Sequence, residues 1–197
     1  MLETLDAYLE ARRAKVTEGH IGEIDDAIHD LEKIASSSNG QHMLEIGFNA
    51  GHSADRLLSA CPEATLISFD IGFHRYGAIG KEYIDKKYTG RHKLVIGDSR
   101  QTIPQYQAHR KCDLIFIDGG HNGEIPWSDI TNCKRLAHKD TIVVVDDTIQ
   151  NNSSWTTPWT VNPTQAWLKA VADHLVVQDG TSEYGRGRGM SWGRYVM

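Results

Sequence analysis

The chain has 197 residues, a length that fits one domain better than two. Hydrophobic residues make up 40% of the chain and only five residues are proline, which excludes a disordered chain. The formal net charge is -5, and this mild acidity argues against a broad nucleic-acid-binding surface, which needs clustered Lys and Arg.

The cysteines and the N-terminus indicate a reduced, cytoplasmic protein. Cys61, Cys112 and Cys133 form no CxxC pair, which argues against a disulfide framework and against a thiolate zinc site. The first 15 residues are charged and lack the apolar stretch of a signal peptide. No apolar run approaches the length of a membrane span, so we expect a cytoplasmic protein without membrane contact.

Two amphipathic helices are predicted at the N-terminus. Apolar residues recur at helical spacing in residues 1–17 and again in residues 21–35, before the polar stretch Ser36 to Gly40 interrupts the pattern. We expect residues 1–38 to form a helical cap on a core that comprises residues 40–197, all within one domain. The two helices either cover a substrate site or build a homodimer, and the sequence leaves both open.

Short apolar runs alternate with longer segments from residue 43 onwards. The runs are rich in Ile, Val, Leu and Phe, as strands covered on both faces are. Strands are predicted at residues 43–46, 65–69, 93–96, 114–117 and 142–145, and helices at about 51–60, 77–88, 100–108 and 127–137. Such alternation is typical of a parallel sheet with right-handed crossovers.

The C-terminal part predicts one more helix and two antiparallel strands. Asn162-Pro163-Thr164-Gln165 has the residue types of a helix start with Asn162 as N-cap, and the helix is expected to end near Asp173. Residues 175–177 and 191–196 are expected to pair around a glycine-rich loop and to close the sheet edge. The predicted fold class is therefore α/β: a Rossmann-like, doubly wound, mostly parallel seven-stranded sheet with an antiparallel C-terminal strand pair.

A glycine-bearing turn follows the first predicted strand. Gly47 and Gly51 lie between this strand and a predicted helix, where a tight turn lets the backbone approach a ligand with helix N–H groups behind it. Asp70 ends the second strand, where an acidic side chain can accept hydrogen bonds from both ribose hydroxyls. The turn and the acid together predict a nucleotide site. The GxxxG spacing fits a dinucleotide site poorly, since that site has GxGxxG.

The stretch Glu45-Ile46-Gly47-Phe48-Asn49-Ala50-Gly51 resembles the first motif of class I S-adenosylmethionine-dependent methyltransferases. Asp70 resembles their second motif, Gly97-Asp98-Ser99 their acidic motif beside the adenine, and Asp118 their fourth motif. The resemblance extends over about residues 40–197. It departs at Asn49, which replaces the usual central glycine, although asparagine tolerates a positive φ better than most residues.

This resemblance implies S-adenosylmethionine as the cofactor. It places Ser53 near the methionine carboxylate and Ile71 beside the adenine ring. The cofactor-binding residues that it implies are Glu45, Gly47, Phe48, Asn49, Gly51, Ser53, Asp70, Ile71, Asp98, Ser99 and Asp118.

Acidic residues end the fourth and fifth predicted strands. Asp118 ends one, and Asp146 and Asp147 end the other, so neighbouring strands about 4.8 Å apart would bring the three carboxylates together where α/β sheets bind ligands. Three converging carboxylates repel one another unless a hard divalent cation such as Mg²⁺ neutralises them. Consecutive residues point to opposite faces of a strand, so Asp146 and Asp147 reach one ion only if the chain bends there.

Asp118-Gly119-Gly120-His121 with the later Asp146-Asp147 resembles metal-dependent small-molecule O-methyltransferases, of the catechol type and of the macrolide and aminocoumarin sugar type. The resemblance implies that Asp118, Asp146 and Asp147 are the metal ligands. It implies that His121 is the general base and, with Asp118, forms the catalytic pair. The expected activity is Mg²⁺-dependent O-methylation of a small hydroxylated molecule, either a sugar or a phenol or catechol.

Other interpretations remain open for these residues. Asp146 and Asp147 can cap the following loop, Asp118 can contact the cofactor alone, and His121 can be a capping or packing residue. The chain would then be a metal-independent methyltransferase acting on nitrogen or on a nucleic acid, or a non-catalytic cofactor-binding module.

Three further segments are expected near the site. Residues 148–161 carry Trp155 and Trp159, which form either a wall for the substrate or a contact with the sheet edge. Residues 72–80 are expected to cover the adenosine as a flap. The basic turn at residues 185–189 is either solvated or binds phosphate or nucleic acid, as an RGG-like segment does.

Overall fold

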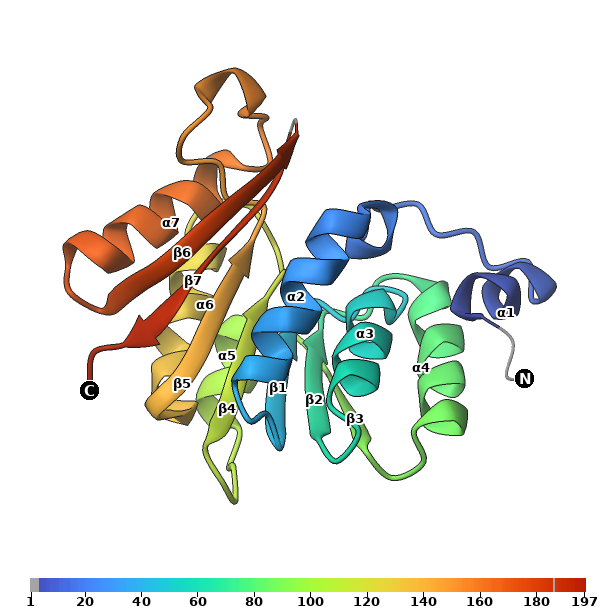
Figure 1. Ribbon diagram of the computed structural model, residues 1–197. Coiled ribbons are helices and arrows are strands. Elements are labelled where there is room, and N and C mark those ends of the chain that lie inside the picture. The colour runs from blue at the N-terminus through green and yellow to red at the C-terminus, as the bar shows by residue number, and fades with distance from the viewer. Residues whose placement is uncertain (1–3, 186) are drawn as a thin grey trace.

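The computed structural model describes residues 4–185 and 187–197, and within them seven strands form one sheet between two layers of helices (Figure 1). The strand order is β3-β2-β1-β4-β5-β7-β6, with β1 to β5 parallel and β7 antiparallel to both β5 and β6. The strands are β1 His42–Ile46, β2 Thr65–Asp70, β3 His92–Ile96, β4 Cys112–Ile117, β5 Ala137–Asp146, β6 Val176–Gly185 and β7 Arg188–Tyr195. The predicted Rossmann-like fold with an antiparallel C-terminal pair is confirmed.

Helices cover both faces of this sheet. Side chains of α2, α3 and α4 pack on one face, where α1 joins them, and side chains of α5, α6 and α7 pack on the other. The helices are α1 Leu5–Ala11, α2 Asp25–Ser37, α3 His52–Ala60, α4 Arg75–Lys87, α5 Ser99–Gln105, α6 Ile125–Cys133 and α7 Val161–Ala172, with short 3₁₀ turns at η1 Ile21–Glu23, η2 Lys134–Leu136 and η3 Ser153–Trp155. In the part of the chain that the structure describes, no helix has the length and apolarity to cross a membrane.

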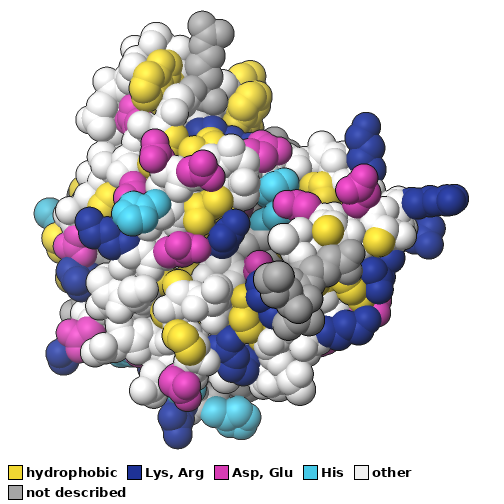
Figure 2. Space-filling model, turned by 45° about the vertical axis from the view of Figure 1, so that its right-hand side comes forward, with side chains coloured by type: hydrophobic (Ala, Val, Ile, Leu, Met, Phe, Trp, Pro, Cys, Tyr) yellow, Lys and Arg dark blue, Asp and Glu magenta, His cyan; other side chains and the backbone are white. Residues whose placement is uncertain are grey.

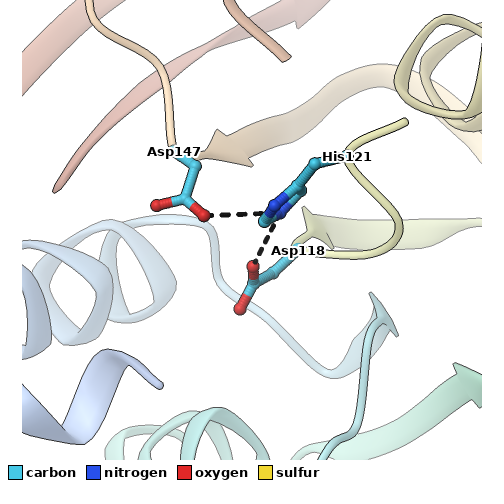
Figure 3. Close-up of side chains that lie close together, drawn as sticks. All are labelled: Asp118, His121 and Asp147. Carbon is cyan, nitrogen blue, oxygen red and sulfur yellow. Dashed lines mark ion pairs between the residues drawn. The ribbon is translucent and has the colours of Figure 1, made fainter. Parts of the chain in front are cut away.

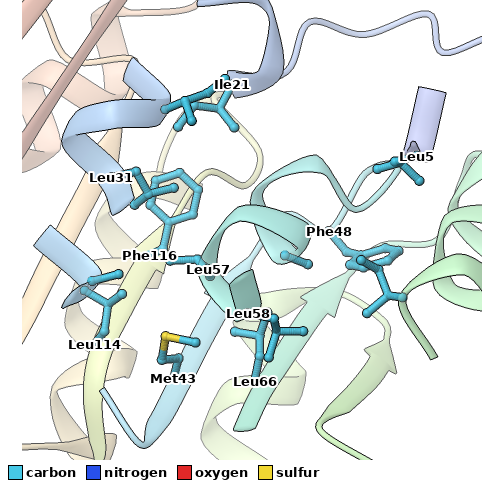
Figure 4. Packing of buried hydrophobic residues seen from close by; sticks show 14 of the residues in the cluster. Leu5, Ile21, Leu31, Met43, Phe48, Leu57, Leu58, Leu66, Leu114 and Phe116 are labelled. Carbon is cyan, nitrogen blue, oxygen red and sulfur yellow. The ribbon is translucent and has the colours of Figure 1, made fainter. Parts of the chain in front are cut away.

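The strands are apolar on both faces because each face is covered. On β1, Met43 belongs to the core cluster on the α2–α4 side and Leu44 to the cluster on the α5–α7 side, and both are buried. Figure 4 shows Leu31 of α2 and Leu57 of α3 beside Phe116 of β4 on the first side. Each such side chain contributes about 1.5–3 kcal/mol when it leaves water.

The predicted first helix is wrong in its boundaries. It spans only Leu5–Ala11 instead of 1–17, because Arg13 takes a left-handed conformation that ends it; residues 1–3 lie outside the described residues.

Residues 72–80, predicted as a flap, are helical from Arg75 onwards, and their covering of the adenosine stays a prediction. Gly80 lies within α4 and allows close packing: a Cβ there would lie 1.9 Å from the Ala50 carbonyl oxygen.

The C-terminal boundaries also differ from the prediction. Helix α7 begins at Val161 with Thr160 as N-cap, so Asn162 does not cap it; the Asn162 side chain instead donates a hydrogen bond to the His121 carbonyl oxygen at 2.8 Å. Strands β6 and β7 extend through most of the predicted glycine-rich loop. Gly185 and Gly187, both with positive φ, confine the turn to a few residues.

Gly47 fixes the end of β1 against its two neighbours. Its N–H donates to the Phe69 carbonyl oxygen of β2 at 2.8 Å, and its φ of 94° is left-handed. A Cβ at this position would lie 1.8 Å from the backbone oxygen of Asp118, which follows β4. Only glycine fits both requirements.

The layer of α6 carries a buried acid that the sequence analysis did not single out. Asp129 is fully buried, and burial raises the pKa of its carboxyl to about 7, which the nearby Ser99 hydroxyl only partly offsets. The folded protein therefore keeps this carboxyl protonated at pH values where the unfolded chain has released the proton.

Replacing Gly47→Ala is expected to lower the free energy of unfolding by about 3 kcal/mol or more, since left-handed strain adds to overlap with the Asp118 backbone. The matched control is Gly90→Ala, where φ is also positive (75°) but no atom lies within 4 Å of the new Cβ, and about 1–2 kcal/mol is expected. Urea unfolding of both variants measures the difference. Equal losses would show that the close approach at Gly47 is not required.

The Asp129 carboxyl ionises near pH 4 in the unfolded chain and near pH 7 in the folded chain. The contribution of this carboxyl to stability therefore falls as the pH rises between these values. Asp129→Asn removes that loss. The free energy of unfolding of the variant, relative to that of the wild type, should therefore rise by up to about 4 kcal/mol between pH 4 and pH 8. Urea unfolding across this range measures the gain. Asp140→Asn is the control with the opposite sign, because Lys139 lowers the pKa of Asp140. A pH-independent difference between Asp129→Asn and the wild type would contradict the assignment.

Candidate functional site

The order of the strands places three acidic strand ends along one edge of the sheet. Strand β1 lies between β2 and β4, so the chain turns to opposite sides of the sheet from there, and such a switch point is where α/β sheets bind ligands. The carboxyl ends of β2, β4 and β5 carry Asp70, Asp118 and Asp146 around it, at the upper edge of the sheet in Figure 1. The predicted nucleotide and acidic residues therefore share one edge.

The turn after β1 has the conformation that the predicted motif requires. Asn49 takes a left-handed φ of 50°, and its N–H donates to Asp70 Oδ2 at 2.9 Å. Gly51 is also left-handed and is the N-cap of α3. The other carboxylate oxygen of Asp70 accepts the N–H of Gly72 at 2.7 Å. Each oxygen has a second lone pair, so the carboxylate retains acceptor capacity for ribose hydroxyls.

Glu45 and Ser53 lie beneath this turn. Glu45 is fully buried, and its two carboxylate oxygens accept hydrogen bonds from Ser53 and Ser68. Burial raises the pKa of Glu45 to about 7, against the effect of both serine hydroxyls. Phe48 is buried as well and stacks on His92 with ring centroids 5.1 Å apart. These residues hold the turn from inside the core, and their direct contact with a cofactor stays a prediction.

Exposed apolar side chains lie at the ends of β2 and β3. Ile71 is 46% exposed, and Phe73 and Ile96 are 82% and 59% exposed, in a region where a flat ring can be covered. Asp98 lies next in the chain, where it caps α5 by accepting the Arg100 N–H at 2.9 Å. Arg100 also pairs with this carboxylate and lowers its pKa. From the sequence, Ile96 was predicted only as the end of a strand, and an apolar residue at an open strand end is the one signal that marks its exposure.

Asp118, His121 and Asp147 converge at the ends of β4 and β5 (Figure 3). His121 Nε2 lies 3.3 Å from Asp147 Oδ2 and 3.8 Å from Asp118 Oδ1. One ligand atom from each residue falls within 4.8 Å of the others. Asp147 has a left-handed φ of 55°, so the chain bends directly after β5, as the predicted acid pair requires. Asp146, the last residue of β5, is buried and lies outside this group of three.

Acidic side chains outnumber basic ones in the group of Asp118, His121 and Asp147. Burial and the neighbouring Asp118 raise the pKa of Asp147 to about 7, and burial raises the pKa of Asp146 well above its usual value. Burial alone would lower the pKa of His121, but Asp118 and Asp147 outweigh it and raise that pKa above its usual value. Asp147 Oδ1 is buried without a hydrogen-bond partner in the described residues. Added positive charge at this point would therefore be stabilising.

The segment before η1 lies over the cofactor turn. The Asn49 side chain donates a hydrogen bond to the Gly19 carbonyl oxygen at 3.3 Å. Glu18, next to Gly19, forms an ion pair of 2.9 Å with His74, which precedes α4. Residues 18 and 19 therefore border the predicted cofactor turn, while the role of the two N-terminal helices stays a prediction.

Arg188 of β7 links this segment to the acidic group. Its guanidinium lies 3.0 Å from Glu23 Oε2 and 3.9 Å from Asp147 Oδ1. Arg188 is thus paired and does not extend freely into solvent, whereas Arg186 of the predicted basic turn lies outside the described residues. Sequence analysis gave Arg188 no role at the site, because both of its acidic partners are remote in the chain.

The tryptophans of residues 148–161 contact the β6–β7 turn. Trp159 Nε1 donates to the Gly187 carbonyl oxygen at 3.3 Å, and the Gly187 N–H donates to the Trp155 carbonyl oxygen at 2.8 Å. Trp159 nevertheless remains 47% exposed. Trp159 thus contacts the β6–β7 turn through its indole N–H, and Trp155 contacts it through its backbone, while a substrate wall stays a prediction.

The surface around this edge has mixed charge. Figure 2 shows acidic and histidine side chains interspersed over the upper part of one face, with Lys and Arg gathered at its right-hand margin. No broad basic surface stands out among the coloured side chains of this view.

Known structures share this fold at low sequence identity. An O-methyltransferase from Bacillus cereus, solved in complex with SAH, has a TM-score of 0.78 and 15% identity over 98% of this chain and 90% of that one. The O-methyltransferase TomG from Streptomyces achromogenes, in complex with SAM, has a TM-score of 0.74 and 16% identity over 98% and 89%. The N-methyltransferase NodS from Bradyrhizobium japonicum has a TM-score of 0.63 and 13% identity over 87% and 96%.

No curated protein matches the chain significantly in a sequence search. A family model described as "Methyltransferase domain" matches residues 44–148, which are 105 of the 197 residues. The match includes the Gly47 turn, Asp70, Asp118 and Asp147, so the resemblance to class I S-adenosylmethionine-dependent methyltransferases is confirmed at the level of family and fold. The chain belongs to this methyltransferase-domain family.

Proposed function

We propose that the chain is an S-adenosylmethionine-dependent O-methyltransferase that acts on a small hydroxylated molecule, a sugar or a phenol, with a divalent cation such as Mg²⁺ in its site. The convergence of Asp118, His121 and Asp147 beside the glycine turn carries this proposal. Two similar structures described as O-methyltransferases, in complex with SAH and SAM, support it.

The turn and its neighbours fit the methyl donor. The N–H groups at the start of α3 follow the left-handed Gly51, and Asp70 is available to ribose hydroxyls. Ile71 and Ile96 offer apolar surface for the adenine, beside the acid of Asp98. S-adenosylmethionine supplies an activated methyl group when it is bound.

The acidic group fits a hard divalent cation. Asp147 Oδ1 is a buried carboxylate oxygen without a hydrogen-bond partner in the described residues, and Asp118 lies within reach of the same point. Oxygen donors of this kind suit Mg²⁺. Asp118 and Asp147 would hold the ion, with Asp146 as the third ligand that the sequence predicts. A cation bound there would lower the pKa of a substrate hydroxyl.

His121 is the proposed general base. Asp118 and Asp147 hold its ring at the group, because Nε2 lies within ion-pair distance of both. The neutral imidazole accepts the hydroxyl proton at a ring nitrogen. The substrate oxygen then forms a bond to the methyl carbon as the bond from that carbon to sulfur breaks. Positioning of the two reactants contributes much of the acceleration.

The acid–histidine group favours oxygen over nitrogen as the methylated atom. Both O- and N-methyltransferases have this fold, so the fold alone does not separate them. A neutral amine is nucleophilic at neutral pH, whereas a hydroxyl must lose its proton, and a site with a base beside cation-binding acids supplies that need.

Asp147→Asn is expected to abolish saturable binding of Mn²⁺ or Mg²⁺ measured by isothermal titration calorimetry, because the variant loses the charge of the buried carboxylate. Asp140→Asn is the matched control, since Asp140 lies exposed towards the opposite end of β5 and should leave metal binding unchanged. Binding that survives Asp147→Asn would remove the metal site from the proposal.

His121→Asn is expected to lower the rate of methyl transfer to catechol by about 10²–10⁴-fold, the usual contribution of a general base. Release of S-adenosylhomocysteine measures the rate, and calorimetry should give an unchanged affinity for S-adenosylmethionine. His29→Asn, at an exposed position of α2, is the matched control with full activity. Unchanged turnover in His121→Asn would exclude this histidine as the base; if catechol is not turned over by the wild type, a panel of vicinal diols and sugars replaces it.

A further inference from the structure

A cavity lies at the edge of the sheet opposite the group of Asp118, His121 and Asp147. Its volume is about 350 Å³, and it is bordered by the amino-terminal ends of β1 to β4 and by residues 106–110 after α5. These strand ends form the lower edge of the sheet in Figure 1. The volume lies within the range of small-molecule sites. Nothing in the proposed methyl transfer uses this cavity.

The lining of the cavity carries only basic and neutral side chains. Neither Asp nor Glu occurs among the lining residues, although the whole chain has a net charge of -5. The lining residues with basic or imidazole side chains are His42, Arg91, His92, Lys93, His109 and Arg110. A local excess of positive charge in an acidic protein favours an anionic ligand.

Two of these cations are free to bind an anion. Lys93 and Arg110 are exposed, and neither forms an ion pair with an acid in the described residues. Arg110 Nη1 lies 3.2 Å from His42 Nε2, and Lys93 Nζ lies 5.5 Å from the centre of the Tyr106 ring. These contacts bring both cations to the cavity without neutralising them.

The other charges near the cavity are already engaged. The Arg91 guanidinium donates to backbone carbonyl oxygens of Leu58, Cys61, Pro62 and Ala64. The Asp113 carboxylate accepts the N–H groups of Gln41 and His42 and also contacts His138. Arg91 is therefore a fixed part of the wall, and Asp113 does not pair with Lys93 or Arg110.

We propose that this cavity binds a small phosphate monoester that carries an aromatic or apolar group. The phosphate lies between Lys93 and Arg110, whose guanidinium fork matches its oxygens. A phosphate monoester carries a charge of about -1.5 to -2 at neutral pH, which suits two unpaired cations. The apolar group lies against Tyr106 and Ile67, which also line the cavity. This site is independent of the methyl-transfer site.

Phenyl phosphate is the probe, titrated by calorimetry into the full chain in EDTA so that no metal can hold it at Asp118 and Asp147. Saturable binding is expected, with phenol and inorganic phosphate each binding more weakly. The double variant Lys93→Glu/Arg110→Glu should weaken the binding of phenyl phosphate at least about tenfold, since two charge-assisted contacts are lost.

Lys33→Glu/Arg13→Glu is the matched control, with the same change of net charge at two exposed positions outside the cavity, and it should bind as the wild type does. Thermal unfolding verifies that both double variants are folded, and Lys93→Gln/Arg110→Gln replaces the charge reversal if it does not fold. Absence of saturable binding, or equal binding in the cavity and control variants, would overturn the proposal. Binding of a DNA oligonucleotide but not of phenyl phosphate would also overturn the proposal, and would indicate that the cavity binds the phosphate backbone of a nucleic acid.

Discussion

The close approach of Gly47 to the Asp118 backbone is the constraint on which the site depends. It joins the turn after β1, where the methyl donor is proposed to bind, to the end of β4, where the acidic group begins. A side chain at Gly47 would separate the two by the width of a methyl group. The strand order makes this contact possible, since β1 lies between β2 and β4 and its turn touches both neighbours. The predicted methyl-donor turn and the acidic group are thus held next to each other by the backbone.

Several acidic side chains of the protein are buried, and burial disfavours their charged form. Glu45, Asp129 and Asp147 each have a pKa raised to about 7, mainly by loss of solvent. The three are satisfied differently. Serine hydroxyls donate to both carboxylate oxygens of Glu45, whereas both oxygens of Asp129 and Oδ1 of Asp147 are buried without a hydrogen-bond partner in the described part of the chain. Of these last two acids, Asp147 lies beside Asp118 and His121, so its surroundings best support a cation.

The sequence predicted the features that depend on local pattern. The strands are apolar because helices cover both faces, and Asp70 and Asp118 stand at strand ends where the alternation of elements puts them. The bend at Asp147 was deduced as a condition for a shared ion, and its left-handed φ meets that condition. The sequence predicted Asp146 as the third ligand and His121 as the base, whereas His121 and not Asp146 lies in the group with Asp118 and Asp147. Side-chain directions after the bend determine this, and local pattern does not specify them.

Features that depend on distant partners were not predictable from the pattern. Arg188 pairs with Glu23, 165 positions away, and no periodicity signals such a contact. The place of residues 72–80 after Asp70 favoured a flap, yet α4 begins at Arg75, and its Gly80 packs against the Ala50 backbone. Glu45 belonged to a cofactor motif, but its burial depends on Ser53 and Ser68 from two other elements. In each case tertiary packing, rather than local propensity, determines the outcome.

The most direct test of the account is isothermal titration of S-adenosylmethionine into the wild-type protein and into Asp70→Asn. Saturable binding at one site is expected in the wild type, and at least about tenfold weaker binding in the variant, since the carboxylate proposed to accept the ribose hydroxyls loses its charge. Absence of binding in the wild type, or equal affinity in both proteins, would contradict the assignment of this turn and this acid as the methyl-donor site.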